Sequence, residues 1–345
     1  MNPSDISQTI DRALAAAGLD RDLPSLAEAR ATIAKALGSA GVLPGASARA
    51  RTAAPASYPG EFLACTHANG AGSRDYKLYV PPSYKSGRPA PLIVMLHGCK
   101  QDPDDFAAGT GMNALADTHG FLVAYPAQHP RANGGNCWNW FEADQQVRTG
   151  AEPSLIAGIV DAIAADHAVD PSRVFVAGLS AGAAMAVILG AAYPEVFAGV
   201  AAHSGLPRGA AHDMGSAFAA MRAAPPQPAG GTPRATSAHV RTIVFHGDAD
   251  ATVNPANGRA IVEQAVAAFE RAELPLRQAP RAAAVVGGRK AASTDFLDPS
   301  GRIAVREWVV QGGAHAWFGG SPAGSYTDAS GPDASAEIVR FFLGQ

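Results

Sequence analysis

The chain has 345 residues, of which 47% are hydrophobic and 17% are charged, and this suits one large globular domain with or without an appendage. The formal net charge is −3 and no run of Lys or Arg stands out, which argues against nucleic acid as a partner. No apolar run approaches the roughly 20 residues that span a bilayer, so we expect no membrane segment.

The first part of the chain differs from the rest. Residues 23–41 repeat apolar side chains at helical spacing and then meet glycines, and residues 44–60 have the Pro/Ala/Ser-rich composition of a linker. We therefore predict a helical N-terminal extension with a linker over residues 1–58 and a catalytic domain over residues 59–345. The opening stretch does not resemble a signal peptide, which favours the cytoplasm, with export by another route as the alternative.

From about residue 60 onward, short β-forming runs alternate with helical stretches. The strand candidates are residues 75–81, 91–98, 120–126, 173–179, 199–205, 241–248 and 306–313. The helix candidates are residues 104–120, 154–170, 183–197, 257–273 and 333–344. Several strand candidates are apolar on both faces, so the alternation predicts an α/β fold with a doubly wound, mostly parallel sheet between helices. Residues 206–238 are rich in Pro and Gly, and we predict an insertion or lid there.

The three cysteines offer little support for a metal site. Cys65, Cys99 and Cys137 form no C-x-x-C pair, and no H-E-x-x-H occurs in the chain. We therefore expect neither a metal nor another cofactor. One disulfide with one free thiol remains compatible with this count.

A single serine stands between two glycines where a predicted strand meets a predicted helix. Residues 178–182 read Gly-Leu-Ser-Ala-Gly, which matches G-x-S-x-G. The pattern alone is common and often marks only a turn, but the strand before it and the helix after it favour a nucleophile elbow. Such a turn strains the serine and needs nearly side-chain-free neighbours, which Gly178, Ala181 and Gly182 supply. We therefore predict Ser180 as a nucleophile at the carboxyl edge of the sheet.

A serine hydroxyl needs a base, and on such a fold the acid and then the histidine follow the serine along the chain. The predicted strand at residues 241–248 is followed by two carboxylates, Asp248 and Asp250, and only His315 follows both. This elimination predicts His315 as the base. We prefer Asp250 as the acid because it lies beyond the strand end, and we expect Asp248 to cap or brace its loop; position alone leaves both open.

Acyl transfer also needs donors for the oxyanion. The backbone N–H of Ala181, the residue after the nucleophile, is one candidate. The second should come from the loop after an earlier strand, where residues 91–98 end in His-Gly, so the N–H of Cys99 or Lys100 is the candidate.

Several blocks together resemble the poly(3-hydroxybutyrate) depolymerase family of esterases, which includes feruloyl and acetylxylan esterase relatives. The blocks are SRDYKLYVP, LIVMLHGCKQ, NCWNWF, RVFVAGLSAGAAMA, HGDADATV, GGAHAWFGG and DASAEIVRFF, in the family's order over about residues 60–345. Phe318 departs from the pattern, because the family usually has proline at that position.

The resemblance implies an α/β-hydrolase fold, ester hydrolysis without a metal, and a triad of Ser180, Asp250 and His315. It also implies a disulfide between Cys99 and Cys137, although the cytosol keeps thiols reduced.

The shared blocks also supply candidates for contacts with the substrate. They are Gln101, Trp138, Asn139, Trp140 and Trp317. For Trp138 and Trp140 packing is an equal alternative, whereas Trp317 lies two residues after His315 and is expected to line the pocket.

We thus expect a serine esterase that binds an ester substrate, most of all hydroxyalkanoate oligomers or polymer. Feruloyl or acetylxylan esters are the alternative substrates. An acyltransferase and a non-catalytic binding protein on the same scaffold are the alternatives of another class. A dehalogenase is excluded, because it needs an aspartate where Ser180 stands.

Overall fold

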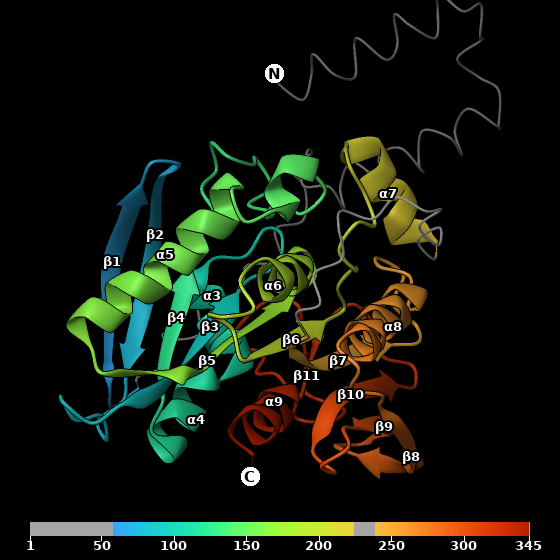
Figure 1. Ribbon diagram of the computed structural model, residues 1–345. Coiled ribbons are helices and arrows are strands. Elements are labelled where there is room, and N and C mark those ends of the chain that lie inside the picture. The colour runs from blue at the N-terminus through green and yellow to red at the C-terminus, as the bar shows by residue number, and fades with distance from the viewer. Residues whose placement is uncertain (1–57, 224–238, 345) are drawn as a thin grey trace, which may run out of the picture. The chain divides into compact units, whose positions relative to one another are not determined.

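The computed structural model describes residues 58–223 and 239–344 (Figure 1). The helix and linker predicted over residues 1–58 lie outside these ranges except for residue 58. Residues 224–238 of the predicted insertion also lie outside them. The chain divides into two units, Met1–Ala54 and Pro55–Gln345, and all described residues belong to the second.

Ten strands form one sheet, and two further strands form a small second sheet. The strands are β1 (Glu61–Asn69), β2 (Gly72–Val80), β3 (Ala90–Leu96), β4 (Leu122–Pro126), β5 (Val169–Leu179), β6 (Gly199–His203), β7 (Arg241–Gly247), β8 (Arg277–Val286), β9 (Arg289–Leu297), β10 (Ile303–Val310), β11 (Trp317–Phe318) and β12 (Thr327–Asp328). The helices are α3 (Pro103–Thr110), α4 (Met112–His119), η1 (Ala143–Gln146), α5 (Ala151–Asp166), α6 (Ala181–Ala192), α7 (Met214–Arg222), α8 (Ala256–Arg271) and α9 (Ala334–Leu343).

The large sheet runs in the order β1-β2-β4-β3-β5-β6-β7-β10-β9-β8. Its centre, from β4 to β10, is parallel throughout, whereas β1 and β2 at one end and β9 and β8 at the other pair antiparallel. The predicted doubly wound, mostly parallel sheet is therefore confirmed. Because the parallel strands share one direction, their carboxyl ends meet along one edge, where α/β proteins bind ligands.

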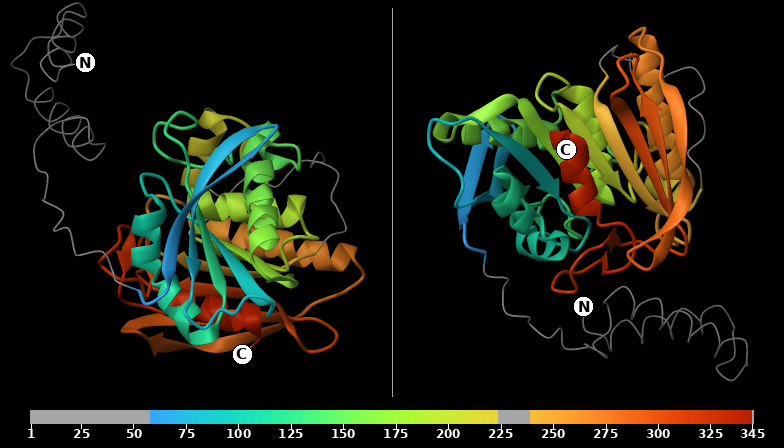
Figure 2. Two further views of the ribbon diagram at one scale, coloured as in Figure 1. Left: turned by 90° about the vertical axis from the view of Figure 1, so that its left-hand side faces the viewer. Right: turned by 90° about the horizontal axis from the view of Figure 1, so that it is seen from below.

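Alternate residues of the central strands supply two separate cores. In β3, Leu92, Val94 and Leu96 pack on one face with α5 and α6, while Ile93 and Met95 pack on the other with α3, α4 and α9. Figure 2 shows these two groups of helices on opposite faces of the sheet. Burial on both faces explains why these strands are continuously apolar in the sequence.

The sequence missed the outer strands. It predicted no strand over β1, β8 or β9. In β8 an Ala-rich run with Pro280 leaves Val285 and Val286 as its two β-branched residues, too few to signal a strand. The outermost strands β1 and β8 are largely exposed, so no run of buried apolar residues marks them. The helix predicted over residues 104–120 is two helices, because Gly111 ends α3 in a left-handed conformation with φ of 62°.

Candidate active site

Ser180 occupies the turn between β5 and α6, at the carboxyl end of a central strand. Its φ of 57° and ψ of −118° lie where residues other than glycine are rarely found. A Cβ on Gly178 would lie 2.4 Å from backbone atoms of Gly182, and a Cβ on Gly182 would lie 2.1 Å from the carbonyl oxygen of Leu96. The prediction that this turn needs side-chain-free neighbours is confirmed, since both glycines are in contact with backbone that cannot move aside.

Two backbone N–H groups adjoin this serine. Ala181 opens α6, so its N–H has no partner within the helix. The loop after β3 also abuts the serine, since a Cβ on Gly98 would lie 3.6 Å from the Ser180 Cβ. The N–H of Lys100 donates to the carbonyl oxygen of Gly135 at 2.7 Å, whereas the N–H of Cys99 has no acceptor among the described residues. Of the two loop candidates, Cys99 is therefore the one with a free donor.

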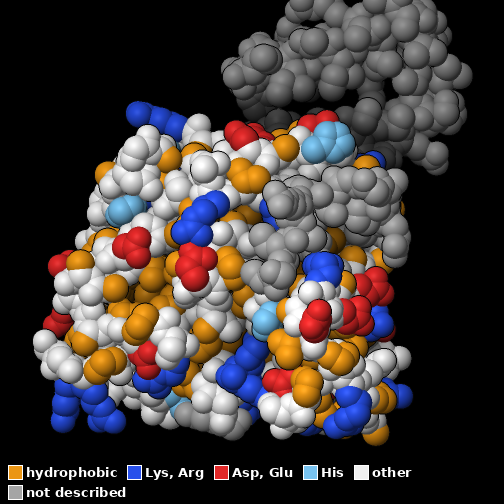
Figure 3. All heavy atoms as spheres, viewed as in Figure 1, with side chains coloured by type: hydrophobic (Ala, Val, Ile, Leu, Met, Phe, Trp, Pro, Cys, Tyr) orange, Lys and Arg blue, Asp and Glu red, His pale blue; other side chains and the backbone are white. Residues whose placement is uncertain are grey.

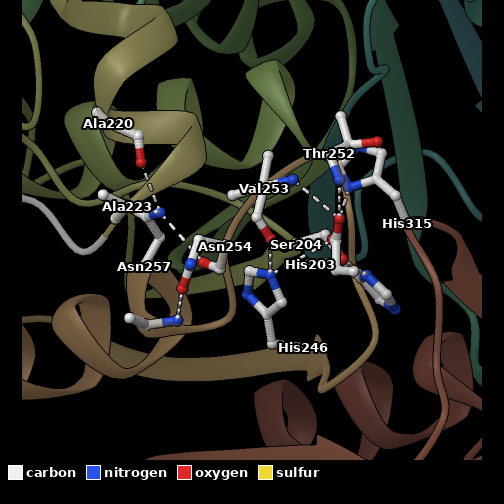
Figure 4. A network of polar contacts seen from close by, with 12 residues as sticks. His203, Ser204, Ala220, Ala223, His246, Thr252, Val253, Asn254, Asn257 and His315 are labelled. Atoms are coloured by element: carbon white, nitrogen blue, oxygen red, sulfur yellow. Dashed lines mark hydrogen bonds and ion pairs between the residues drawn. The ribbon is translucent and has the colours of Figure 1, made fainter.

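Asp250 and His315 meet across the loops after β7 and β10. His315 Nδ1 lies 2.7 Å from Asp250 Oδ2, and the other carboxylate oxygen accepts the N–H groups of Thr252 and Val253 at 2.8 Å each. Figure 4 shows Thr252, Val253, His246 and His315 in this network of polar contacts. No hydrogen bond joins Ser180 Oγ to the His315 ring among the contacts of residues 58–223 and 239–344, and such contacts often form only with substrate.

Asp248 makes a different contact from Asp250. Its Oδ1 accepts the N–H of Gly312 at 2.6 Å, and its own N–H donates to the carbonyl oxygen of Val310 at 3.1 Å. Asp248 thus braces the backbone of the loop that carries His315. The sequence left the two aspartates open, and only the tertiary contacts separate their roles.

His203 links the serine turn to the His315 loop, and sequence reasoning missed it. Its carbonyl oxygen accepts the Ser180 N–H at 2.9 Å, and its ring Nε2 accepts the Phe318 N–H at 3.1 Å. The remaining ring proton then sits on Nδ1, 3.2 Å from Ser204 Oγ, so this hydrogen-bond network fixes a neutral tautomer. Complete burial lowers the pKa of His203 well below its usual value, helped by His246 and His315. The signal in the sequence that could have identified His203 is its place as a polar residue at the end of a buried strand.

A second buried histidine, His246, also contacts Asp250. His246 Nε2 lies 3.0 Å from the carbonyl oxygen of Val253 and 3.4 Å from Asp250 Oδ2. The ring is therefore in contact with the same carboxylate as His315, from the side of the β7 strand. His246 is the penultimate residue of β7, before Gly247. Its position in the sequence does not show that its side chain contacts Asp250.

The Gln101 side-chain amide holds the loop after β3, and its role as a substrate contact stays a prediction. Its Oε1 accepts the Gly98 N–H at 2.9 Å, and its Nε2 donates to Asp105 Oδ2 at 2.8 Å and to the carbonyl oxygen of Ser325 at 3.0 Å. Only 2% of the residue is exposed, so both ends of the amide are occupied within the protein.

The three aromatic candidates are all buried, and for Trp138 and Trp140 this favours the packing alternative. Trp138 is fully buried and its indole N–H donates to the carbonyl oxygen of His97 at 3.1 Å. Trp140 packs in the same core. Trp317 is 1% exposed, and its indole N–H donates to Ser335 Oγ at 3.0 Å.

Asn139 is likewise occupied within the protein. Its N–H and its side-chain amide both donate to the buried Glu152 carboxylate, each at 2.8 Å. These contacts give Asn139 a structural role, and its contact with substrate stays a prediction. The neighbouring Cys137 is joined to Cys99 by a disulfide, and Cys65 is free and partly exposed.

The described residues contain no group of His, Cys, Asp and Glu that could hold a metal ion. None of the helices in the described ranges is both long and apolar enough to cross a membrane. On the face seen in Figure 3, the described Lys and Arg side chains are interspersed with Asp and Glu.

Comparison with known proteins identifies the family. Residues 74–273 match the family model described as "Esterase PHB depolymerase", and this is more than half of the chain. The chain belongs to this esterase family. This is the family that the sequence blocks resemble, so the expected family is confirmed.

Individual relatives are consistent with this family. The chain is 40% identical to poly(3-hydroxyalkanoate) depolymerase C of Paucimonas lemoignei, over 58% of this chain and 51% of the relative. It is 30% identical to a probable acetylxylan esterase A of Aspergillus fumigatus, over 55% of this chain and 53% of the relative. The chain thus spans about half the length of these relatives.

A solved structure agrees with the fold. The acetyl xylan esterase from Aspergillus awamori superposes with a TM-score of 0.62, at 20% identity, over 83% of this chain and 100% of that chain. The expected α/β-hydrolase fold is confirmed.

Proposed function

We propose that the chain is a carboxylic ester hydrolase that works through an acyl-enzyme on Ser180. One observation carries the proposal: a serine in a strained strand-to-helix turn shares the carboxyl edge of the sheet with a histidine whose Nδ1 is 2.7 Å from a buried aspartate. Membership in an esterase family supports the same chemistry.

In the proposed reaction, Ser180 attacks the ester carbonyl while His315 Nε2 takes the hydroxyl proton. Asp250 holds the His315 tautomer and stabilises the imidazolium without taking the proton itself. The N–H groups of Ala181 and Cys99 receive the oxyanion, and loss of one such donor typically costs about 3 kcal/mol of barrier. His315 then protonates the departing alcohol, and water releases the acid by the same steps in reverse.

The substrate class that we propose is a hydroxyalkanoate ester, as oligomer or polymer. The stronger of the two similarities reported above, 40% against 30% identity, is to a poly(3-hydroxyalkanoate) depolymerase. Acetylated or feruloylated polysaccharide is the second candidate, supported by the similarity to an acetylxylan esterase.

The test compares wild type with Ser180→Ala on 3-hydroxybutyrate dimer and trimer, methyl ferulate, acetylated xylan and p-nitrophenyl butyrate. We expect Ser180→Ala to lower kcat on the order of 10⁶-fold, because loss of the nucleophile in a serine hydrolase has an effect of that size. Ser86→Ala is the matched control, since Ser86 is exposed in the β2–β3 connection. Unchanged activity in Ser180→Ala would contradict the mechanism, and preference for ferulate or acetylxylan would contradict the substrate class. Transfer to an added alcohol in preference to water would instead indicate an acyltransferase.

We also infer that the protein works in an oxidising compartment, the alternative to the cytoplasm. The Cys99–Cys137 disulfide supports this inference, because cytosolic reductants keep such pairs open. Protein isolated from its own cells under thiol-blocking conditions should carry one blocked thiol rather than three.

A further inference from the structure

We propose that Glu152 is a positioning residue for the loop that carries the second oxyanion donor. This inference rests on the proposed esterase function. The oxyanion loop is here residues 97–100, and the bracing segment is residues 128–139. Among the described residues the Glu152 carboxylate makes no hydrogen bond to the oxyanion loop. It acts by holding the bracing segment, which is bonded to that loop.

The bracing segment is attached to the oxyanion loop at several points. The Gln128 N–H donates to His97 Nε2, and the Trp138 indole N–H donates to the His97 carbonyl oxygen, both at 3.1 Å. The Lys100 N–H donates to the segment's Gly135 at 2.7 Å, and the Cys99–Cys137 disulfide adds a covalent link. The position of the Cys99 N–H therefore depends on where this segment lies.

The bracing segment has no regular structure to fix it. It lies between the end of β4 at Pro126 and the start of η1 at Ala143, and no helix or strand falls inside it. Without a helix or a strand ladder, its position must come from side-chain contacts and local turns.

Glu152 supplies the contacts that hold both ends of the segment. Its Oε2 accepts the Asn139 N–H and its Oε1 accepts the Asn139 side-chain amide, each at 2.8 Å. At the other end, the Gln128 side-chain amide donates to Oε1. One carboxylate thus receives three donors from residues eleven positions apart in the sequence.

The Glu152 carboxylate is buried, and the groups around it stabilise its charge. Glu152 is 3% exposed and lies in the first turn of α5, where the helix dipole favours a negative charge. Arg74, 5% exposed, donates to the Gln128 Oε1, so one amide stands between the two buried charges. Burial raises the pKa of Glu152, and the donors from Gln128 and Asn139 together with Arg74 oppose that rise.

Removing the carboxylate should displace the oxyanion donor without touching the reacting groups. In Glu152→Gln, an NH₂ group must face at least one of the three donors, because the side chain has the same shape but one acceptor fewer. A misplacement of about 1 Å can cost about 100-fold in rate, so we expect kcat to fall about 10- to 100-fold while KM stays within about threefold.

Inhibition by a trifluoromethyl ketone analogue of the substrate distinguishes a displaced oxyanion donor from a loss of folded protein. Addition of the Ser180 hydroxyl to this ketone creates an oxyanion, so its Ki reports on the oxyanion donors and does not depend on the active fraction. We expect Ki to rise by the same factor as kcat falls. Glu142→Gln is the matched control, because Glu142 is exposed ten residues before Glu152.

The outcomes are distinct. A rise in Ki matched by a fall in kcat, absent from Glu142→Gln, supports the positioning role. Unchanged Ki in folded Glu152→Gln overturns it, even if kcat falls through loss of active enzyme. If Glu152→Gln does not fold, Asn139→Ala removes one of the three donors, and the same paired change is expected at a smaller size. If the wild-type protein hydrolyses none of the esters, the proposed function is contradicted, and this inference fails with it.

Discussion

At the scale of single residues, Asp250 shows how surroundings set the state of a group. Its side chain is fully buried, and burial alone would raise its pKa. Hydrogen bonds from His246 and His315 and from the Val253 N–H outweigh burial, so the pKa of Asp250 is lowered. The Asp250 carboxylate therefore stays ionised below the pH at which an exposed aspartate would take up a proton.

The two aspartates after β7 provide a paired prediction. Asp250→Asn should lower kcat about 10⁴-fold, because an amide facing His315 Nδ1 favours the wrong tautomer. Asp248→Asn should change kcat by less than about tenfold, since an asparagine oxygen still accepts the Gly312 N–H. Steady-state kinetics on the preferred ester measure both. A larger loss in Asp248→Asn than in Asp250→Asn would reverse the assignment of the acid.

At the scale of elements, the β5–α6 turn is a tightly constrained junction. The Ser180 backbone takes a strained conformation there, and Gly182 lies against the backbone of the next strand, β3. The strain persists because the sheet and helix on either side are well packed.

Gly182→Ala should therefore destabilise the protein and abolish activity. The new Cβ would lie 2.1 Å from the Leu96 carbonyl oxygen, and neither backbone can move without disturbing the sheet. We expect a loss of about 3 kcal/mol in unfolding free energy, the upper end of the usual range for overpacked sites. Denaturant unfolding measures it, with Gly70→Ala as control, because a Cβ there meets nothing within 4 Å. Equal stability of the two variants would show that the turn can relax.

At the scale of the whole molecule, two buried histidines make stability depend on pH. Burial lowers the pKa of His97 and lowers that of His203 well below its usual value. The unfolded chain then binds more protons than the folded chain once the pH falls below about 6.5. Their contribution to stability is therefore complete above that pH and is lost as the pH decreases.

His203→Gln should make the pH dependence of unfolding shallower. Each such histidine adds a slope of up to about 1.4 kcal/mol per pH unit below its unfolded pKa, and glutamine removes one of them. Unfolding free energies at pH 7.5, 6.5 and 5.5 measure the slope, with the exposed His119→Gln as control. If His203→Gln keeps the wild-type slope, His203 takes up a proton in the folded state without cost.

The sequence by itself determined the class of fold and the candidate catalytic residues. Continuous apolar strands alternating with helices predicted the parallel sheet, because strands covered on both faces must be apolar throughout. G-x-S-x-G between strand and helix, followed in chain order by two candidate aspartates and then His315, predicted the site because these signals are local or depend only on order.

Only the tertiary structure decided which polar groups meet. The roles of Asp248 and Asp250 separate through contacts with Gly312 and His315, more than 60 residues away. Closeness to His315 in sequence predicts that Trp317 lines the pocket, whereas only the tertiary structure shows that its indole is buried and donates to Ser335. Hydrogen bonds between loops distant in sequence leave no periodic pattern in the chain, because they depend on how the sheet brings its strand ends together.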